Sequence, residues 1–175
     1  MIRPYRNVRA QVGARVYIDD SAQIIGDVSL GDDVSVWPLV TIRGDVNSIR
    51  IGARSNVQDN SVLHVTHDGP YSPGGVALTV GEDVTVGHGV ILHACSIGAR
   101  CLIGMGAIVM DRVVVEDECL VAAGSLVPAG KRLESGWLYR GSPAQPVRPL
   151  SDAEREHLLY SAGHYVRLKD SYLED

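Results

Sequence analysis

The sequence lacks phenylalanine, and its aromatic residues together make up only 5% of 175 positions. Apolar residues still account for 45% of the chain, so a buried core is available, but pairs of aromatic rings cannot dominate it. Nineteen glycines and abundant valine and isoleucine favour many short strands joined by tight turns. These features suit a core of thin, stacked layers better than a sandwich of two sheets.

The sequence also lacks a basic cluster, since its net charge is −5 and its acidic residues are spread along the chain. Nucleic acid is therefore not expected as a partner. No run of about 18 apolar residues is present, which argues against a membrane-spanning helix, and the first residues lack a signal-peptide segment. The three cysteines form no CxxC pair, as is usual in a reducing compartment. We expect a cytoplasmic protein that binds neither membranes nor nucleic acid.

A six-residue repeat of apolar positions runs through most of the chain. Its longest stretch comprises Ile97, Ile103, Val109, Val115, Val121 and Val127. Earlier stretches with the same step are Ile24, Leu30, Val36 and Ile42, then Ile51, Val57 and Leu63, then Val80, Val86 and Leu92. The residue two places before each is often small or β-branched, and residues two apart share one face of a strand. Coils built this way stack and bury a continuous apolar column.

The cysteines at positions 95, 101 and 119 occupy the second inward position of their hexapeptides, so we interpret them as core residues. The repeat predicts a β-helix domain over residues 1–130, with a loop at 67–77 where the step lengthens. A linker is predicted at 131–150 and a helix at 151–175. Ser151 and Glu154 form a capping box for that helix. Its expected apolar stripe, packed on the β-helix, comprises Leu158, Leu159, Ala162, Val166 and Leu173.

The repeat register predicts where three of the histidines lie relative to one another. His64 and His93 each follow an inward-facing leucine at the same position of adjacent coils, so both point outward, about 4.8 Å apart. Two such rings can share one zinc ion, whose bonds to nitrogen are about 2.0–2.1 Å long. His88 falls on the neighbouring face and cannot easily reach that ion within one subunit. We therefore predict a metal site shared between subunits of a trimer, with His88 supplied by the neighbour.

The remaining histidines are less informative. His67 lies beside the predicted loop, where surface exposure or proton relay would explain it. His157 and His164 fall on the terminal helix and are interpreted as solvated or packed.

Several short motifs resemble the γ-class carbonic anhydrase family. They are Ile42-Arg43-Gly44-Asp45, Asn56-Val57-Gln58-Asp59-Asn60, Leu63-His64, Gly87-His88-Gly89-Val90-Ile91-Leu92-His93, Ile103-Gly104-Met105-Gly106-Ala107 and Arg140-Gly141-Ser142-Pro143-Ala144. The resemblance covers nearly the whole chain. It implies an all-β fold, a left-handed parallel β-helix of hexapeptide repeats with a C-terminal α-helix packed on it.

The resemblance also implies roles for individual residues. It implies a homotrimer that binds zinc, or iron or cobalt, through His64 and His93 of one chain and His88 of the next. A metal-bound hydroxide would convert carbon dioxide to bicarbonate. Arg43 and Asp45 would form an intersubunit ion pair that places Arg43 near the bicarbonate pocket.

Other matching positions would complete the pocket. Gln58 would hold the hydroxide or the substrate, and Asp59 would orient a ligand. Tyr165 is the best match to the family's pocket tyrosine, with Tyr160 as the substitute. The acidic loop of the best-known members is missing, because Asp68 is the only acid in 67–77, and His67 or Asp68 would have to export protons.

Two other classes of function remain open from the sequence. Many hexapeptide β-helices are CoA-dependent acyltransferases with a histidine as general base, and a metal-hydroxide thioesterase would use the same residues. The second class is a non-catalytic scaffold that keeps its metal for stability. Met105 and Met110, one coil above His88 and His93, would line a carbon dioxide pocket or simply pack at an interface.

Overall fold

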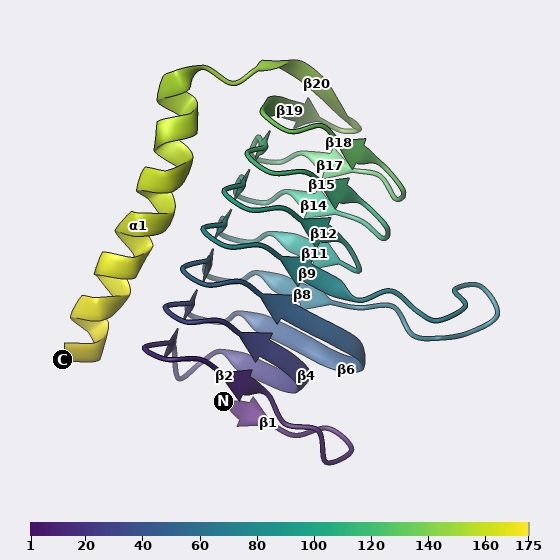
Figure 1. Cartoon of the computed structure of the whole chain (residues 1–175). Coiled ribbons are helices and arrows are strands. Elements are labelled where there is room, and N and C mark those ends of the chain that lie inside the picture. Colours follow the sequence, from purple (N-terminus) through teal and green to yellow (C-terminus); the bar gives the residue numbers. More distant parts are fainter. Residues whose placement is uncertain (175) are drawn as a thin grey trace.

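A computed structural model, described here over residues 1–174, shows a left-handed parallel β-helix with one C-terminal helix alongside it (Figure 1). The fold class is thus confirmed. The strands are short and form three faces. The helix face, so named because the helix packs on it, contains β3 (Tyr17–Ile18), β5 (Ser35–Val36), β7 (Asn56–Val57), β10 (Thr85–Val86), β13 (Leu102–Ile103), β16 (Leu120–Val121) and β19 (Trp137–Gly141).

The second face, called the histidine face, contains β8 (Val62–His64), β11 (Ile91–His93), β14 (Ile108–Val109) and β17 (Leu126–Val127). The third face contains β9 (Leu78–Val80), β12 (Ser96–Ile97), β15 (Val114–Val115) and β18 (Arg132–Leu133). Two long strands, β4 (Gln23–Leu30) and β6 (Thr41–Ile51), pair with each other and turn the corner between these two faces. The first strands, β1 (Ile2–Arg3) and β2 (Gln11–Val12), pair with β4.

The apolar positions of the repeat form the core, in the register that the sequence predicts. Leu63 pairs with Leu92 in the next coil, and both side chains are fully buried. The three cysteines are also buried, as expected for core residues. The frequent glycine after the apolar residue has a steric cause at the corners. A Cβ atom on Gly52 would lie 2.6 Å from the backbone of Gly81 in the next coil.

The prediction of a linker over 131–150 is wrong. The six-residue step continues past Val127 to Leu133 and Tyr139, and both side chains are buried. Accordingly β18 pairs in parallel with β15, and β19 pairs in parallel with β16. The chain then reverses into β20 (Ala144–Pro149), which pairs antiparallel with β19. This segment continues the coil because its inward residues cover core that would otherwise be open at the end of the solenoid.

The helix α1 (Asp152–Glu174) runs back along the helix face and contacts β3, β5, β7 and β10 (Figure 1). Its predicted capping box is confirmed, because the Glu154 amide donates to the Ser151 hydroxyl and the Ser151 amide donates to the Glu154 carboxylate. Residue 175, the last of the predicted helix, lies outside the described residues. Within residues 1–174, no helix has the length and apolar character needed to cross a bilayer.

The predicted apolar stripe of α1 is only partly correct. Leu158 and Ala162 are buried, but Leu159 and Leu173 are about half exposed. The third buried residue of α1 is Lys169, whose ammonium pairs with Asp33 of the β-helix at 3.1 Å and with the neighbouring Asp170. A buried charge therefore helps to anchor the C-terminal half of the helix.

Several of the few aromatic residues gather beneath this half of α1. Trp37 contacts Tyr17, Tyr165 and Tyr172, with ring centroids 5.2–5.5 Å apart. Such tilted and edge-on pairs stabilise a contact beyond the area that they bury. The cluster holds Tyr165 against the helix face.

Substitution of Lys169 tests the ionic anchor. Because Lys169→Met leaves Asp33 with Arg15 as its remaining partner, we expect a loss of about 3 kcal/mol in unfolding free energy, near the lower end for breaking a buried pair. Urea unfolding measures it. Arg167→Met, at an exposed position of the same helix, is the control; equal stability of the two variants would contradict an anchoring role.

Candidate metal site

Two of the predicted ligands lie together on the histidine face. Strands β8 and β11 are paired so that His64 stands opposite His93 in the next coil. The ring centroids are 5.2 Å apart, and the Nδ1 atom of His64 faces the Nε2 atom of His93 at 3.2 Å. The stacking in adjacent coils is the arrangement that the repeat register predicts.

Asp45 fixes the far side of the His64 ring. Its Oδ1 atom lies 3.1 Å from His64 Nε2, and its Oδ2 atom accepts a 2.5 Å bond from Arg43. The ion pair of Arg43 and Asp45, which the resemblance implied between subunits, is thus formed within one chain. Burial alone would raise the pKa of Asp45, but the hydrogen bonds from Arg43 and His64 outweigh it, and the pKa is lowered. Asp45 is therefore an ionised acceptor at neutral pH, and His64 donates to it from Nε2.

Asp111 does the same for His93. Its Oδ1 atom lies 2.7 Å from His93 Nδ1, and its other oxygen accepts the hydroxyl of Thr66. Here too burial would raise the pKa, but the bonds from Thr66 and His93 prevail and lower it. An ionised carboxylate has no proton to donate, so the His93 ring carries its proton on Nδ1.

The two carboxylates therefore leave both facing nitrogens without a proton when the rings are neutral. Burial lowers the pKa of His64, and Arg43 adds to that effect while Asp45 opposes it. Two lone pairs 3.2 Å apart repel each other unless a cation lies between them. Two nitrogens bound to one tetrahedral zinc ion are about 3.3 Å apart, given bonds of about 2.0–2.1 Å. The donor set and its spacing thus fit a shared metal ion.

His88 lies elsewhere in the same chain. It follows β10 on the helix face, and its Nδ1 atom is 2.8 Å from Asp59. No group of three histidine, cysteine, aspartate or glutamate side chains within residues 1–174 is arranged to hold a metal ion. One subunit therefore provides two facing ligands and, separately, a third histidine that also donates to a carboxylate.

A groove of about 380 Å³ runs beside His88, between the coils and α1. Gln58, Met105 and Tyr165 are among its lining residues. Gln58 is buried, and its Nε2 atom donates to Asn56 at 3.1 Å. Burial raises the pKa of the Tyr165 hydroxyl, and the negative charge of Asp59 adds to it, so the hydroxyl is protonated at neutral pH.

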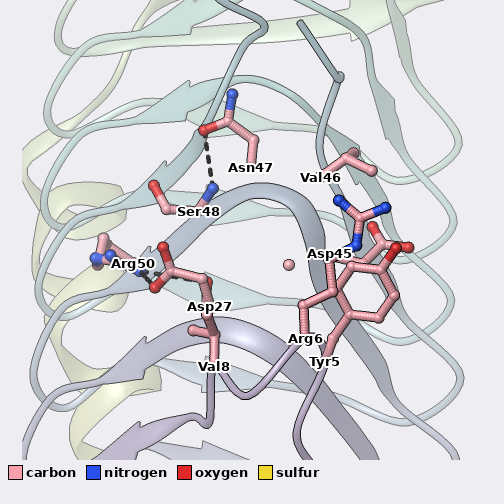
Figure 2. Close-up of a pocket in the computed structure, with 10 residues that line it drawn as sticks. Tyr5, Arg6, Val8, Asp27, Asp45, Val46, Asn47, Ser48 and Arg50 are labelled. Atoms are coloured by element: carbon pink, nitrogen blue, oxygen red, sulfur yellow. Dashed lines mark hydrogen bonds and ion pairs between the residues drawn. The ribbon is translucent and has the colours of Figure 1, made fainter.

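A separate polar pocket of about 430 Å³ lies at the corner where the step from Ile42 to Ile51 is lengthened (Figure 2). Asp45 reaches its wall, and Arg50 pairs there with Asp27 at 2.8 Å. Among the described residues, its lining contains no histidine.

The sequence predictions missed Asp111 and Thr66. Asp111 follows His93 by 18 residues, one coil of the repeat, which is the signal that could have indicated it. By strand register, however, Met110 rather than Asp111 stands opposite His93, so a search of the same column passes over it.

Comparison with known proteins assigns the chain to a family. Residues 9–44 and 94–129 match the bacterial transferase hexapeptide family (six repeats). The protein YrdA of Escherichia coli (strain K12) is 60% identical over 174 residues, which cover 99% of this chain and 95% of YrdA. The mitochondrial gamma carbonic anhydrase 2 of Arabidopsis thaliana is 40% identical over 87% of this chain, which spans 55% of that relative. The chain belongs to the family of hexapeptide-repeat proteins that includes YrdA, and its relatives include proteins named gamma carbonic anhydrases.

Solved structures of this family carry a second kind of name. A hexapeptide transferase family protein from Anaplasma phagocytophilum superimposes with a TM-score of 0.91 at 39% identity, covering 98% of each chain. Relatives of this chain are thus named both as carbonic anhydrases and as transferases.

The facing nitrogens predict zinc binding that depends on the histidine pair. We expect His64→Ala and His93→Ala each to lower zinc affinity roughly 100-fold or more, because each removes one of the two facing nitrogens between which the ion would be held. Competition with a chromophoric chelator measures this. His157→Ala, exposed on α1, should bind zinc like the unchanged protein, and equal zinc binding by all three variants would refute the site.

Proposed function

We propose that this protein catalyses the reversible hydration of carbon dioxide to bicarbonate at a metal ion held between subunits of a homotrimer. Zinc is the first candidate, with iron or cobalt as alternatives. The observation that carries the proposal is the facing pair of nitrogens on His64 and His93, 3.2 Å apart and each backed by a carboxylate. His88 of an adjacent subunit would complete the ligand set. A relative named as a gamma carbonic anhydrase supports the same chemistry.

When bound by three neutral imidazoles, such a metal ion lowers the pKa of a coordinated water toward roughly 7. The contribution of the chain is to orient those imidazoles and to determine which nitrogen of each ring faces the metal. Each histidine of the set contacts a carboxylate through one ring nitrogen, Asp45 for His64, Asp59 for His88 and Asp111 for His93. Ligand histidines in proteins are commonly oriented in this way.

Arg43 and Gln58 are assigned to the substrate. The Arg43 side chain is 42% exposed and spends one of its donors on Asp45, which leaves other N–H groups to attract a bicarbonate anion. Gln58 donates one amide hydrogen to Asn56, and this bond fixes the orientation of its carboxamide. Tyr165 would offer its hydroxyl as a hydrogen-bond donor from α1.

Proton export is assigned to His67. Its imidazole is exposed beside the loop, and an imidazole ring can accept a proton on one nitrogen and release one from the other. Asp68 is less suited, because its carboxylate accepts the backbone amide of Gly74 at 2.7 Å and so holds the loop together.

An apolar ladder on the histidine face is assigned to the subunit contact. Val62, Ile91 and Ile108 stand opposite one another in successive coils and are 40%, 39% and 37% exposed. Val62 and Ile91 lie on the strands that carry His64 and His93, and Ile108 lies one coil further on. A neighbouring subunit that covers these side chains would therefore also approach the ligand pair. Met105, 58% exposed beside His88, is a matching apolar residue for that neighbour's surface.

Acyl transfer or thioester hydrolysis with a CoA-linked substrate is the second candidate. The groove beside His88 favours it, because about 380 Å³ with a largely apolar lining exceeds what carbon dioxide needs. In that reading His88, paired with Asp59, would act as general base.

The first proposal predicts carbon dioxide hydration by the zinc-loaded protein in stopped-flow assays. We expect His93→Ala to lower kcat/KM at least 100-fold, because the site loses a ligand. A zinc-loaded protein no faster than this variant would rule out hydration, and acyl-CoA hydrolysis under the same conditions would favour the second candidate.

Sharing of the site predicts complementation between inactive variants. Trimers mixed from His88→Ala and His93→Ala chains have one intact site each, so statistical mixing restores about a quarter of the sites in a cyclic trimer. Zinc content and hydration rate after denaturation and joint refolding measure this. No recovery, with mixed trimers demonstrated by mass spectrometry, would contradict a shared site.

The apolar ladder predicts a loss of assembly. We expect Ile91→Asp to shift the trimer toward monomer in sedimentation velocity, because a charge is placed in a desolvated contact. Thr79→Asp, exposed on the third face, is the matched control. A trimer that survives Ile91→Asp would assign the contact to another surface.

A further inference from the structure

We infer that Asp111 is a positioning residue that couples the loop following His64 to the orientation of His93. The inference rests on the proposed function for its metal ion, but the contacts that carry it lie within one chain. They link the start of the loop, through the Thr66 hydroxyl and the Asp111 carboxylate, to the His93 ring.

Both oxygens of Asp111 are engaged, each by a different part of the chain. One oxygen accepts the His93 Nδ1 proton at 2.7 Å, and the other accepts the Thr66 hydroxyl. A carboxylate held at a single oxygen can rotate about its last side-chain bond, but one held at both cannot. Thr66 therefore determines where Asp111 directs its acceptor, and that acceptor determines which nitrogen of His93 carries the proton.

Thr66 is itself fixed by the loop. Its amide and carbonyl pair with those of Val76 at 3.0 and 2.9 Å, which closes the loop at its base. The loop then projects from the solenoid between β8 and β9 (Figure 1). A displacement of the loop base would thus move the Thr66 hydroxyl that holds Asp111.

The residue after Asp111 provides a second tie to the same loop. Arg112 donates from Nη2 to the Ser72 hydroxyl at 2.8 Å, and Ser72 is buried although it lies in the loop. Two consecutive residues of one corner, Asp111 and Arg112, thus hold the loop at its base and near its middle. Because the loop is attached at both points, a change in its position would displace Asp111 and, through it, the His93 ring.

Without Asp111, the neutral His93 ring is free to carry its proton on Nε2. That proton would then point at His64 Nδ1, across the 3.2 Å gap, and would have to be displaced before a cation could bind there. Loss of an outer hydrogen-bond partner typically lowers metal affinity about 10–100-fold.

Histidine tautomers of the metal-free protein give the direct test. Long-range proton–nitrogen spectra of ¹⁵N-histidine-labelled protein should show His93 as one Nδ1–H tautomer, and as a mixture in Asp111→Ala, which removes both acceptor oxygens. Zinc affinity of Asp111→Ala, measured by chelator competition, should fall about 10–100-fold. Asp20→Ala, at an exposed aspartate far from the site in sequence, is the control for charge.

Thr66 variants separate positioning from general stability. Thr66→Val removes the hydroxyl at nearly constant shape and should shift the His93 tautomer as Asp111→Ala does, whereas Thr66→Ser keeps the hydroxyl and should keep the tautomer of the unchanged protein. Thermal unfolding of each variant checks that the fold persists, and only folded variants are compared.

A single Nδ1–H tautomer of His93 in folded Asp111→Ala, with zinc affinity within twofold of the unchanged protein, would overturn the inference. This outcome is distinct from failure of the proposed function. The tautomer is read without metal, so it reports on Asp111 even if the zinc-loaded protein hydrates no carbon dioxide.

Discussion

Backbone hydrogen bonds between adjacent coils hold each outward side chain about one strand spacing above its counterpart. The bonds from the Val62 amide to the Val90 carbonyl and from the Ala94 amide to the His64 carbonyl, both 2.9 Å, belong to this ladder. Because the ladder is parallel, its register fixes which residues stack, inward as well as outward. The inward set gives an apolar column, and the outward set brings His64 to His93.

The same stacking brings one nitrogen of His64 and one of His93 face to face, which is electrostatically unfavourable when neither carries a proton. Two neutral rings one coil apart could share a proton in a direct hydrogen bond, but Asp45 and Asp111 claim the protons on the far sides. The ionised state of both carboxylates follows from their own partners, Arg43 and Thr66, which offset the cost of partial burial. The fit of a cation between the rings therefore depends on Asp45 and Asp111 and on the residues that keep these carboxylates ionised.

Much of this architecture could be predicted from the sequence, because a six-residue step specifies both the direction of each side chain and the coil above it. The buried cysteines and the opposition of His64 and His93 follow from the repeat register, together with the β-helix that the family resemblance implies. The segment 131–150 was misjudged because Trp137 and Tyr139 stand where earlier coils have β-branched residues, and prolines mask the continued step.

Other features depend on distances that a repeat does not encode. Lys169 is buried on α1 because Asp33 meets it from a different element, and no pattern within the helix indicates that partner. Asp111 reaches His93 from one position beyond the paired column. In the proposed trimer the relation of His88 to the pair would depend on two subunits, and the intrachain register assigns His88 only to a different face.

The antiparallel hairpin of β19 and β20 has a consequence for how copies of the chain avoid one another. A solenoid that ends in an open parallel coil presents unpaired amides and carbonyls on which a further coil from another molecule could grow, as in fibre formation. β20 occupies part of that template with a strand of the opposite direction, and Pro146 and Pro149 leave this strand with two fewer hydrogen-bond donors. Because β20 runs in the opposite direction, it prevents a further parallel coil from extending the solenoid at this end. Lateral association through the faces of the solenoid is then the route left for assembly.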